Sequence, residues 1–210
     1  MLSALSRKQS VDVRLPVTRP VLHELIRSLR FTNSSTFQRP LYATMFRVAF
    51  YGLFRIGKLA TKNMGIVSLV VQFHSLTFLS THEAKISISN YKHKSSNRPF
   101  NIILAREDSQ PFCPVTALLQ YCSTRGDPPG PLFCHADYSP ISVHQFNCEL
   151  HRCLAFCGLD MSRYKSHSFR IGGACHPVDK GYPDAQIRAL GSWKSEPFKV
   201  YLRSTVCHAN

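Results

Sequence analysis

The chain has 210 residues, of which 44% are hydrophobic and 11% aromatic, and this composition excludes a disordered protein. Its 26 Lys and Arg residues outnumber its 12 Asp and Glu residues, which gives a formal net charge of +14. Such an excess favours a polyanionic partner, most often nucleic acid, although a basic protein without a specific partner is the alternative from charge alone. No apolar run has the length of a membrane span, so we predict no membrane partner.

The eight cysteines form no CxxC pair, and the N-terminus has no secretory hydrophobic segment. Reduced thiols that pack as small core side chains are therefore the expected state. Cys153 and Cys157 are spaced i, i+4, which leaves a structural zinc site as the alternative. We predict no cofactor, because no cluster of carboxylates suggests a metal ion.

Apolar spacing predicts a first helix over residues 21–29, which Pro20 precedes in its first turn. A cap-rich break at 33–36 separates it from a long, mostly buried helix over 37–54, which would deliver Arg55 at its end. A cation there also complements the helix dipole, so a plain helix cap is the structural alternative for Arg55.

The period then changes to that of strands, over residues 70–78, 85–91 and 100–104. The polar turn 92–97 carries Lys92 and Lys94 at the tip of the last hairpin, where a solvated basic turn is the alternative. The second half alternates short elements with turns. We expect a helix over 115–121, a rigid loop over 126–131, a short strand over 132–134, and helices over 142–158, from 166 to a stop at Pro177, over 184–190 and over 196–202.

These elements predict an α+β fold, mainly α, with one small antiparallel sheet. We expect one domain over residues 19–210, and a disordered N-terminal segment over residues 1–18.

The C-terminal part gathers groups that can hold a phosphodiester and attack it with an oxygen nucleophile. They are a histidine, an indole N–H, a phenol and two arginines: His167, Arg170, Trp193, Tyr201 and Arg203. Each has a structural alternative when taken singly, since a histidine is usually hydrogen-bonded in place and a Trp or Tyr usually packs in a core.

The order of these groups resembles the catalytic domain of the tyrosine recombinases, the phage-integrase family. The resemblance runs from Leu22 to Ser204 and rests on Arg55 after a long helix, a lysine on a β-hairpin, His167-x-x-Arg170, Gly-x-Trp193 and Tyr201-x-Arg203. The motifs Cys113-Pro114-Val115, Gly130-Pro131-Leu132-Phe133 and His167-Ser-Phe-Arg-Ile-Gly172 are most similar to the versions carried by eukaryotic mobile elements.

The resemblance implies site-specific cleavage and rejoining of DNA strands, without a metal ion. Arg55 and Arg170 would bind the non-bridging phosphate oxygens, as guanidinium pairs do, and His167 and Trp193 would complete the shell. Tyr201 would form a 3′-phosphotyrosine. Lys92 would protonate the leaving 5′-hydroxyl, with Lys94 as the alternative.

Four basic residues are predicted to bind DNA: Lys94, Lys165, Lys194 and Arg203. The implied partner is double-stranded DNA, on which the protein would form a homo-oligomer, and no small-molecule substrate is expected. A nuclear location follows from the substrate alone.

Some positions depart from the family pattern. Lys58 replaces a usually acidic residue after Arg55, Ser192 replaces Arg or His before Trp193, and His176-Pro177 interrupts the helix after Arg170. Because residues 1–18 are too few for it, we also expect the family's N-terminal clamp domain to be absent. These departures support the alternative of a catalytically inactive DNA-binding relic of a mobile-element recombinase.

Overall fold

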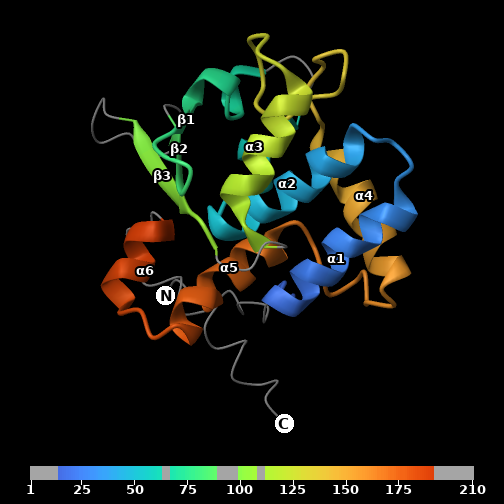
Figure 1. The fold of residues 1–210 in the computed structure, drawn as a ribbon. Helices are drawn as coiled ribbons and strands as arrows, with labels where there is room; N and C mark the ends of the chain where they lie inside the picture. The colour runs from blue at the N-terminus through green and yellow to red at the C-terminus, as the bar shows by residue number, and fades with distance from the viewer. Residues whose placement is uncertain (1–13, 63–66, 89–98, 108–111, 192–210) are drawn as a thin grey trace, which may run out of the picture.

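The computed structural model describes residues 14–62, 67–88, 99–107 and 112–191, with the backbone alone for 188–191. In these residues six α-helices pack together, and one small sheet lies at an edge of the domain (Figure 1). The helices are α1 (Arg19–Thr32), α2 (Gln38–Tyr51), α3 (Pro114–Arg125), α4 (Val143–Phe156), α5 (His167–Asp179) and α6 (Asp184–Gly191). This confirms a mainly α fold with one small antiparallel sheet. None of the described helices is long and apolar enough to cross a membrane.

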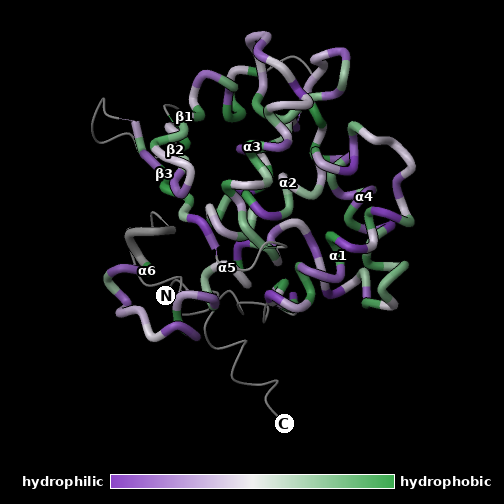
Figure 2. Tube along the Cα trace, in the orientation of Figure 1, coloured by the Kyte–Doolittle hydropathy of each residue, from purple (hydrophilic) through white to green (hydrophobic). Residues whose placement is uncertain are grey.

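Helix α2 forms the centre of the fold and packs against α1, α3 and α5, while α1 also packs against α4 (Figure 1). Eight of its residues are buried, because it is covered on several sides. Helix α1 instead buries one stripe, Leu22, Leu25 and Leu29, and hydrophobic and hydrophilic residues alternate along its trace (Figure 2). A capping box between Ser142 and Gln145 begins α4, as the predicted N-cap at Ser142 requires.

The sheet has the order β1–β2–β3, with strands Leu76–Phe78, Glu83–Ile88 and Phe100–Ala105, and both pairings are antiparallel. The side chain of Ile86 is buried, and this residue pairs with Leu76 on one side and Ile102 on the other. The predicted hairpin is therefore confirmed, but the prediction of a strand from residue 70 was wrong. Residues 73–75 form a 3₁₀ turn (Phe73–Ser75) instead, which leads into a much shorter β1.

Two helix ends also differ from expectation. Helix α2 ends at Tyr51, three residues before the predicted end, because Gly52 and Leu53 leave the helical conformation. Helix α5 does not stop at Pro177 but continues to Asp179. Pro177 lies in the last turn and only two residues of α5 follow it, so little helix remains for it to disrupt.

Part of the N-terminal segment for which we expected no order packs against the domain. The Leu15 N–H donates to the Arg163 carbonyl (2.9 Å) and the Val17 N–H donates to the Ser168 carbonyl (3.0 Å). Val17 is completely buried. Residues 14–18 therefore form part of the surroundings of α5, while residues 1–13 lie outside the described residues.

Candidate functional site

The chain leaves the helical conformation in a turn where α2 ends. The Gly52 N–H still donates to the Val48 carbonyl (2.9 Å), but Leu53 adopts a positive φ of 52°, a region that residues with a side chain rarely enter. Leu53 is 3% exposed, so buried contacts hold this conformation. The turn releases the Leu53 carbonyl from the helix and makes it available to another element.

Arg170 of α5 uses that carbonyl. Its Nη1 donates to the Leu53 oxygen, and the Arg170 residue is 8% exposed. The two segments are far apart in sequence, and the contact brings the end of α2 against the first half of α5. His167, the first residue of α5, is half-buried and lies one helical turn before Arg170, which places both on adjacent positions of one face.

Two glycines permit this close approach. A Cβ atom on Gly173 would lie 2.1 Å from the Phe50 carbonyl oxygen, and one on Gly172 would lie 1.8 Å from the Val17 carbonyl oxygen. Both distances are far below a normal contact, and both neighbours are backbone atoms that cannot rotate away. The Gly172-Gly173 pair therefore allows α5 to lie directly on α2 and on the N-terminal segment.

Arg55 follows the Leu53 turn by two residues. Its backbone is extended (φ −74°, ψ 131°), and its carbonyl accepts a hydrogen bond from the Lys58 N–H (2.8 Å) at the 3₁₀ turn Ile56–Lys58. The Arg55 side chain is exposed, and within the described residues it has no assigned ion pair. The alternative of a helix cap is wrong, because α2 ends four residues earlier. Lys58 is half-buried, and burial lowers the pKa of its ammonium group.

The loop before α5 uses Lys165 structurally. Its backbone N–H donates to the Ser168 hydroxyl (3.0 Å), and its exposed ammonium group donates to the Met161 carbonyl (2.9 Å). An ammonium group has three donors, so this contact leaves Lys165 able to bind a phosphate. Its role in DNA binding stays a prediction.

The other predicted site residues lie outside the described residues. Lys92 and Lys94 belong to the connection between β2 and β3, and the rest follow α6: Trp193, Lys194, Tyr201 and Arg203. The structure thus brings together the segments of Arg55, His167 and Arg170, and it leaves the other roles as predictions. Within the described ranges, no group of three or more His, Cys, Asp and Glu residues could hold a metal ion.

Sequence reasoning missed a charge cluster around Glu107, just after β3. The Glu107 carboxylate lies 3.5 Å from Nη2 of Arg19 and 3.2 Å from Nζ of Lys180, and its Oε1 lies 3.6 Å from Nε2 of His176. The cluster ties the end of the sheet to the start of α1 and the end of α5. His176, which departs from the family pattern, therefore belongs to this cluster near the end of α5. The sequence signal for this cluster was weak, because it contains a single acidic residue, Glu107.

Solved structures share this architecture. The chain matches the XerH site-specific recombinase bound to difH substrate in a pre-cleavage complex, with a TM-score of 0.65 and 15% identity over 90% of this chain and 50% of that one. It matches a lambda integrase dimer bound to a COC′ core site, with a TM-score of 0.65 and 14% identity over 94% of this chain and 50% of that one. For the Tn1549 transposon integrase in complex with circular intermediate DNA, the TM-score is 0.57 and the identity is 10%, over 95% of this chain and 62% of that one.

These matches show that the chain has the fold of a tyrosine-recombinase catalytic domain. The chain spans about half the length of the first of these structures. No family model matches the sequence, and no curated protein matches it.

Proposed function

We propose that the protein cleaves and rejoins DNA strands through a 3′-phosphotyrosine intermediate on Tyr201. The observation that carries the proposal is the joining of the Arg55 and Arg170 segments through the Leu53 turn. A shared fold with recombinases and integrases whose structures contain their DNA substrates supports it. The net charge of +14 suits the same partner.

In the proposed reaction the Tyr201 oxygen attacks the phosphorus, and the bond from phosphorus to the 5′-oxygen breaks. The phenol proton passes to His167, and Lys92 (alternatively Lys94) supplies a proton to the leaving 5′-oxygen. Arg55 and Arg170 neutralise the extra negative charge that develops on the non-bridging oxygens, and the Trp193 indole N–H adds one hydrogen bond. No metal ion is needed, because guanidinium groups supply the positive charge.

Arg170 and Arg55 would have different roles, because one is buried and the other is exposed. Arg170 is buried and fixed by a backbone carbonyl, so it is held in one orientation before substrate arrives. Arg55 is exposed on a short extended segment that follows the same turn. We therefore expect Arg55 to meet the phosphate from solvent and Arg170 to supply a second, preorganised guanidinium.

The proposal includes double-stranded DNA as the partner, with Lys94, Lys165, Lys194 and Arg203 as phosphate contacts, and a homo-oligomer assembled on it. It also includes an origin in a eukaryotic mobile element and action in the nucleus. The dimeric lambda integrase structure supports the oligomer by analogy of fold.

The second candidate function is DNA binding without cleavage. Lys58 favours it, because a half-buried cation stands close in sequence to Arg55 where the family usually has an acidic residue. In that case the site would still hold a phosphate but would lack the surroundings that orient it for attack.

One experiment separates the two functions. The full chain is incubated with a labelled duplex that carries a nick near the cleavage position, and the product is denatured in detergent. Protein-linked label that disappears in Tyr201→Phe is the result expected for a recombinase. Salt-sensitive binding without any linked label would show a DNA-binding relic, and linked label that persists in Tyr201→Phe would disprove the nucleophile.

A further inference from the structure

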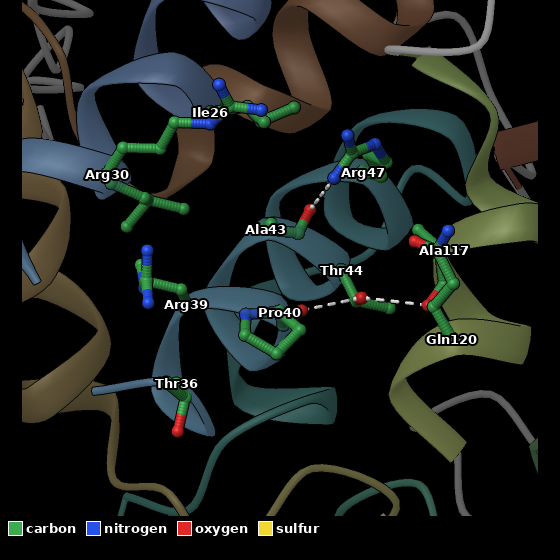
Figure 3. A pocket seen from close by; sticks show the side chains of 11 residues that line it. Ile26, Arg30, Thr36, Arg39, Pro40, Ala43, Thr44, Arg47, Ala117 and Gln120 are labelled. Carbon is green, nitrogen blue, oxygen red and sulfur yellow. Dashed lines mark hydrogen bonds between the residues drawn. The ribbon is translucent and has the colours of Figure 1, made fainter. Parts of the chain in front are cut away.

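A pocket of about 310 Å³ opens between α1, α2 and α3, away from the Leu53 turn. Arg30 of α1 and Arg39 and Arg47 of α2 line it (Figure 3). None of the residues that line it belongs to the Leu53 turn, to the Arg55 segment or to α5. The pocket is therefore a different place from the site described above.

The three guanidinium groups come from two helices. Every lining residue is described, and none of them is Asp or Glu. The remaining lining is apolar or neutral, with Ile26, Pro40 and Gln120 among it. Three cations around one hollow repel one another, so an anion in the hollow would lower the energy of the folded protein.

Two of the arginines are held in place by backbone carbonyls. The Arg39 Nε donates to the Ser35 carbonyl (3.3 Å), and the Arg47 Nη1 donates to the Ala43 carbonyl (2.9 Å) (Figure 3). Guanidinium groups have five donors, so the terminal Nη groups of Arg39 can still bind a ligand. A fixed fork of donors loses little entropy on binding and matches the oxygens of a phosphate.

Removal from water lowers the pKa of Arg47 from its ordinary value to about 10, because the charged form is less well solvated there. Thr44 fixes the floor of the pocket by donating to the Pro40 carbonyl (2.7 Å) and approaching the Ala117 carbonyl (3.2 Å), which holds α2 against α3. The hollow is thus built mainly from packed helices, with Thr36 of the connection between α1 and α2 also lining it.

We propose that this pocket binds a phosphate group through Arg30 and Arg39, with the charge of Arg47 two helical turns farther along α2. The group would belong either to a small phosphorylated molecule or to the DNA backbone, since both present the same oxygens. At about 310 Å³ the pocket lies at the lower end of the range for small-molecule sites, large enough for a phosphate and a short substituent. The proposal does not depend on strand cleavage.

The test uses the full chain, labelled with ¹⁵N and titrated with inorganic phosphate at constant ionic strength, with chloride as the reference salt. We expect saturable shifts of the arginine Nε–Hε resonances, with about tenfold weaker binding in Arg30→Gln and Arg39→Gln. Arg27→Gln is the matched control, because it removes the same charge from an exposed position of α1 that is paired with Glu24. Circular dichroism confirms that each variant folds.

A parallel arm measures duplex binding against salt concentration. If the pocket takes a DNA phosphate, Arg30→Gln and Arg39→Gln each reduce the salt slope by about one, and Arg27→Gln does not. Saturable phosphate binding with unchanged salt slopes identifies a small phosphorylated ligand. The proposal is overturned if phosphate causes no saturable shift and the slopes are unchanged, or if Arg27→Gln has the same effect as the pocket variants. Failure of covalent DNA linkage leaves these results unaffected.

Discussion

Arg170 donates a hydrogen bond to the carbonyl of Leu53, 117 positions earlier in the chain. The same guanidinium is proposed to bind the scissile phosphate, so one side chain has a structural and a chemical role. Arg55, its proposed partner, is exposed and lies beyond the turn that Leu53 forms. Substitution should therefore affect the two arginines differently.

Arg170→Met should lower the free energy of unfolding by about 2 kcal/mol, because the buried Leu53 carbonyl loses its donor. Arg55→Met should change it by less than about 0.5 kcal/mol, as is usual at an exposed position. Both should abolish covalent linkage to nicked DNA. Urea unfolding and the detergent-stable adduct are the two measurements, and equal stability of the two variants would contradict the structural role of Arg170.

Gly173 should tolerate no side chain. In Gly173→Ala the new Cβ would lie 2.1 Å from the Phe50 carbonyl oxygen, so α5 must move away from α2. We expect a loss of about 3 kcal/mol in the free energy of unfolding, at the upper end of overpacking effects, together with loss of the DNA adduct as Arg170 moves with its helix.

Gly57→Ala is the matched control for this change. Its Cβ would lie 3.4 Å from the flexible end of the Lys62 side chain, an ordinary contact, so the variant should differ from the parent by less than about 0.5 kcal/mol. Gly173→Ala with a stability close to that of Gly57→Ala would show that α5 can shift without cost.

Arg125 should stabilise the loop that follows α3. It is 2% exposed, and its guanidinium donates to the carbonyls of Gly126 and Pro128 (both 2.9 Å) and Pro131 (3.0 Å) and lies 4.1 Å from the centre of the Phe73 ring. Arg125→Met would leave these carbonyls without their donor, and we expect a loss of about 3 kcal/mol.

Limited proteolysis should also cut the loop 126–131 faster in Arg125→Met than in the parent. Arg27→Met is the control, since its ion pair with Glu24 is largely exposed and contributes little. Unchanged cleavage of the loop in Arg125→Met would mean that its prolines alone hold it.

The sequence predicted the order and type of most elements because their signals are local. Ser142 and Pro20 mark helix starts, and the alternation along Lys85–Ile88 marks a strand. It predicted a rigid loop at 126–131 but not the buried Arg125 that organises it, because an arginine at a helix end usually faces water.

The predicted site depended on resemblance for its residues, and the structure adds how Arg170 is held. The Leu53 turn was missed because an apolar residue after a helical run looks like more helix. Gly52 was the available signal for the helix end. The role of Gly172-Gly173 could not be predicted, since it depends on the distance between two helices that are remote in sequence.

Stability should fall in mild acid because of His176. Its side chain is 13% exposed, and burial lowers its pKa from the ordinary value near 6.5, with the cation of Lys180 acting in the same direction. Arg19 adds to this effect, whereas the Glu107 carboxylate opposes it. The folded protein thus binds a proton at His176 less readily than the unfolded chain does.

This difference in proton binding sets the direction in which the free energy of unfolding changes with pH. At pH values above the unfolded pKa both states are neutral at His176, and the folded state keeps its full stability. As the pH falls through about 6.5, the unfolded chain gains a proton first, so the free energy of unfolding decreases until the folded pKa is also passed. Between about pH 7.5 and about pH 5.5, His176→Gln should lose less stability than the parent, measured by urea unfolding. His74→Gln, which changes an exposed histidine, is the control, and an identical slope in all three proteins would exclude His176 as the source.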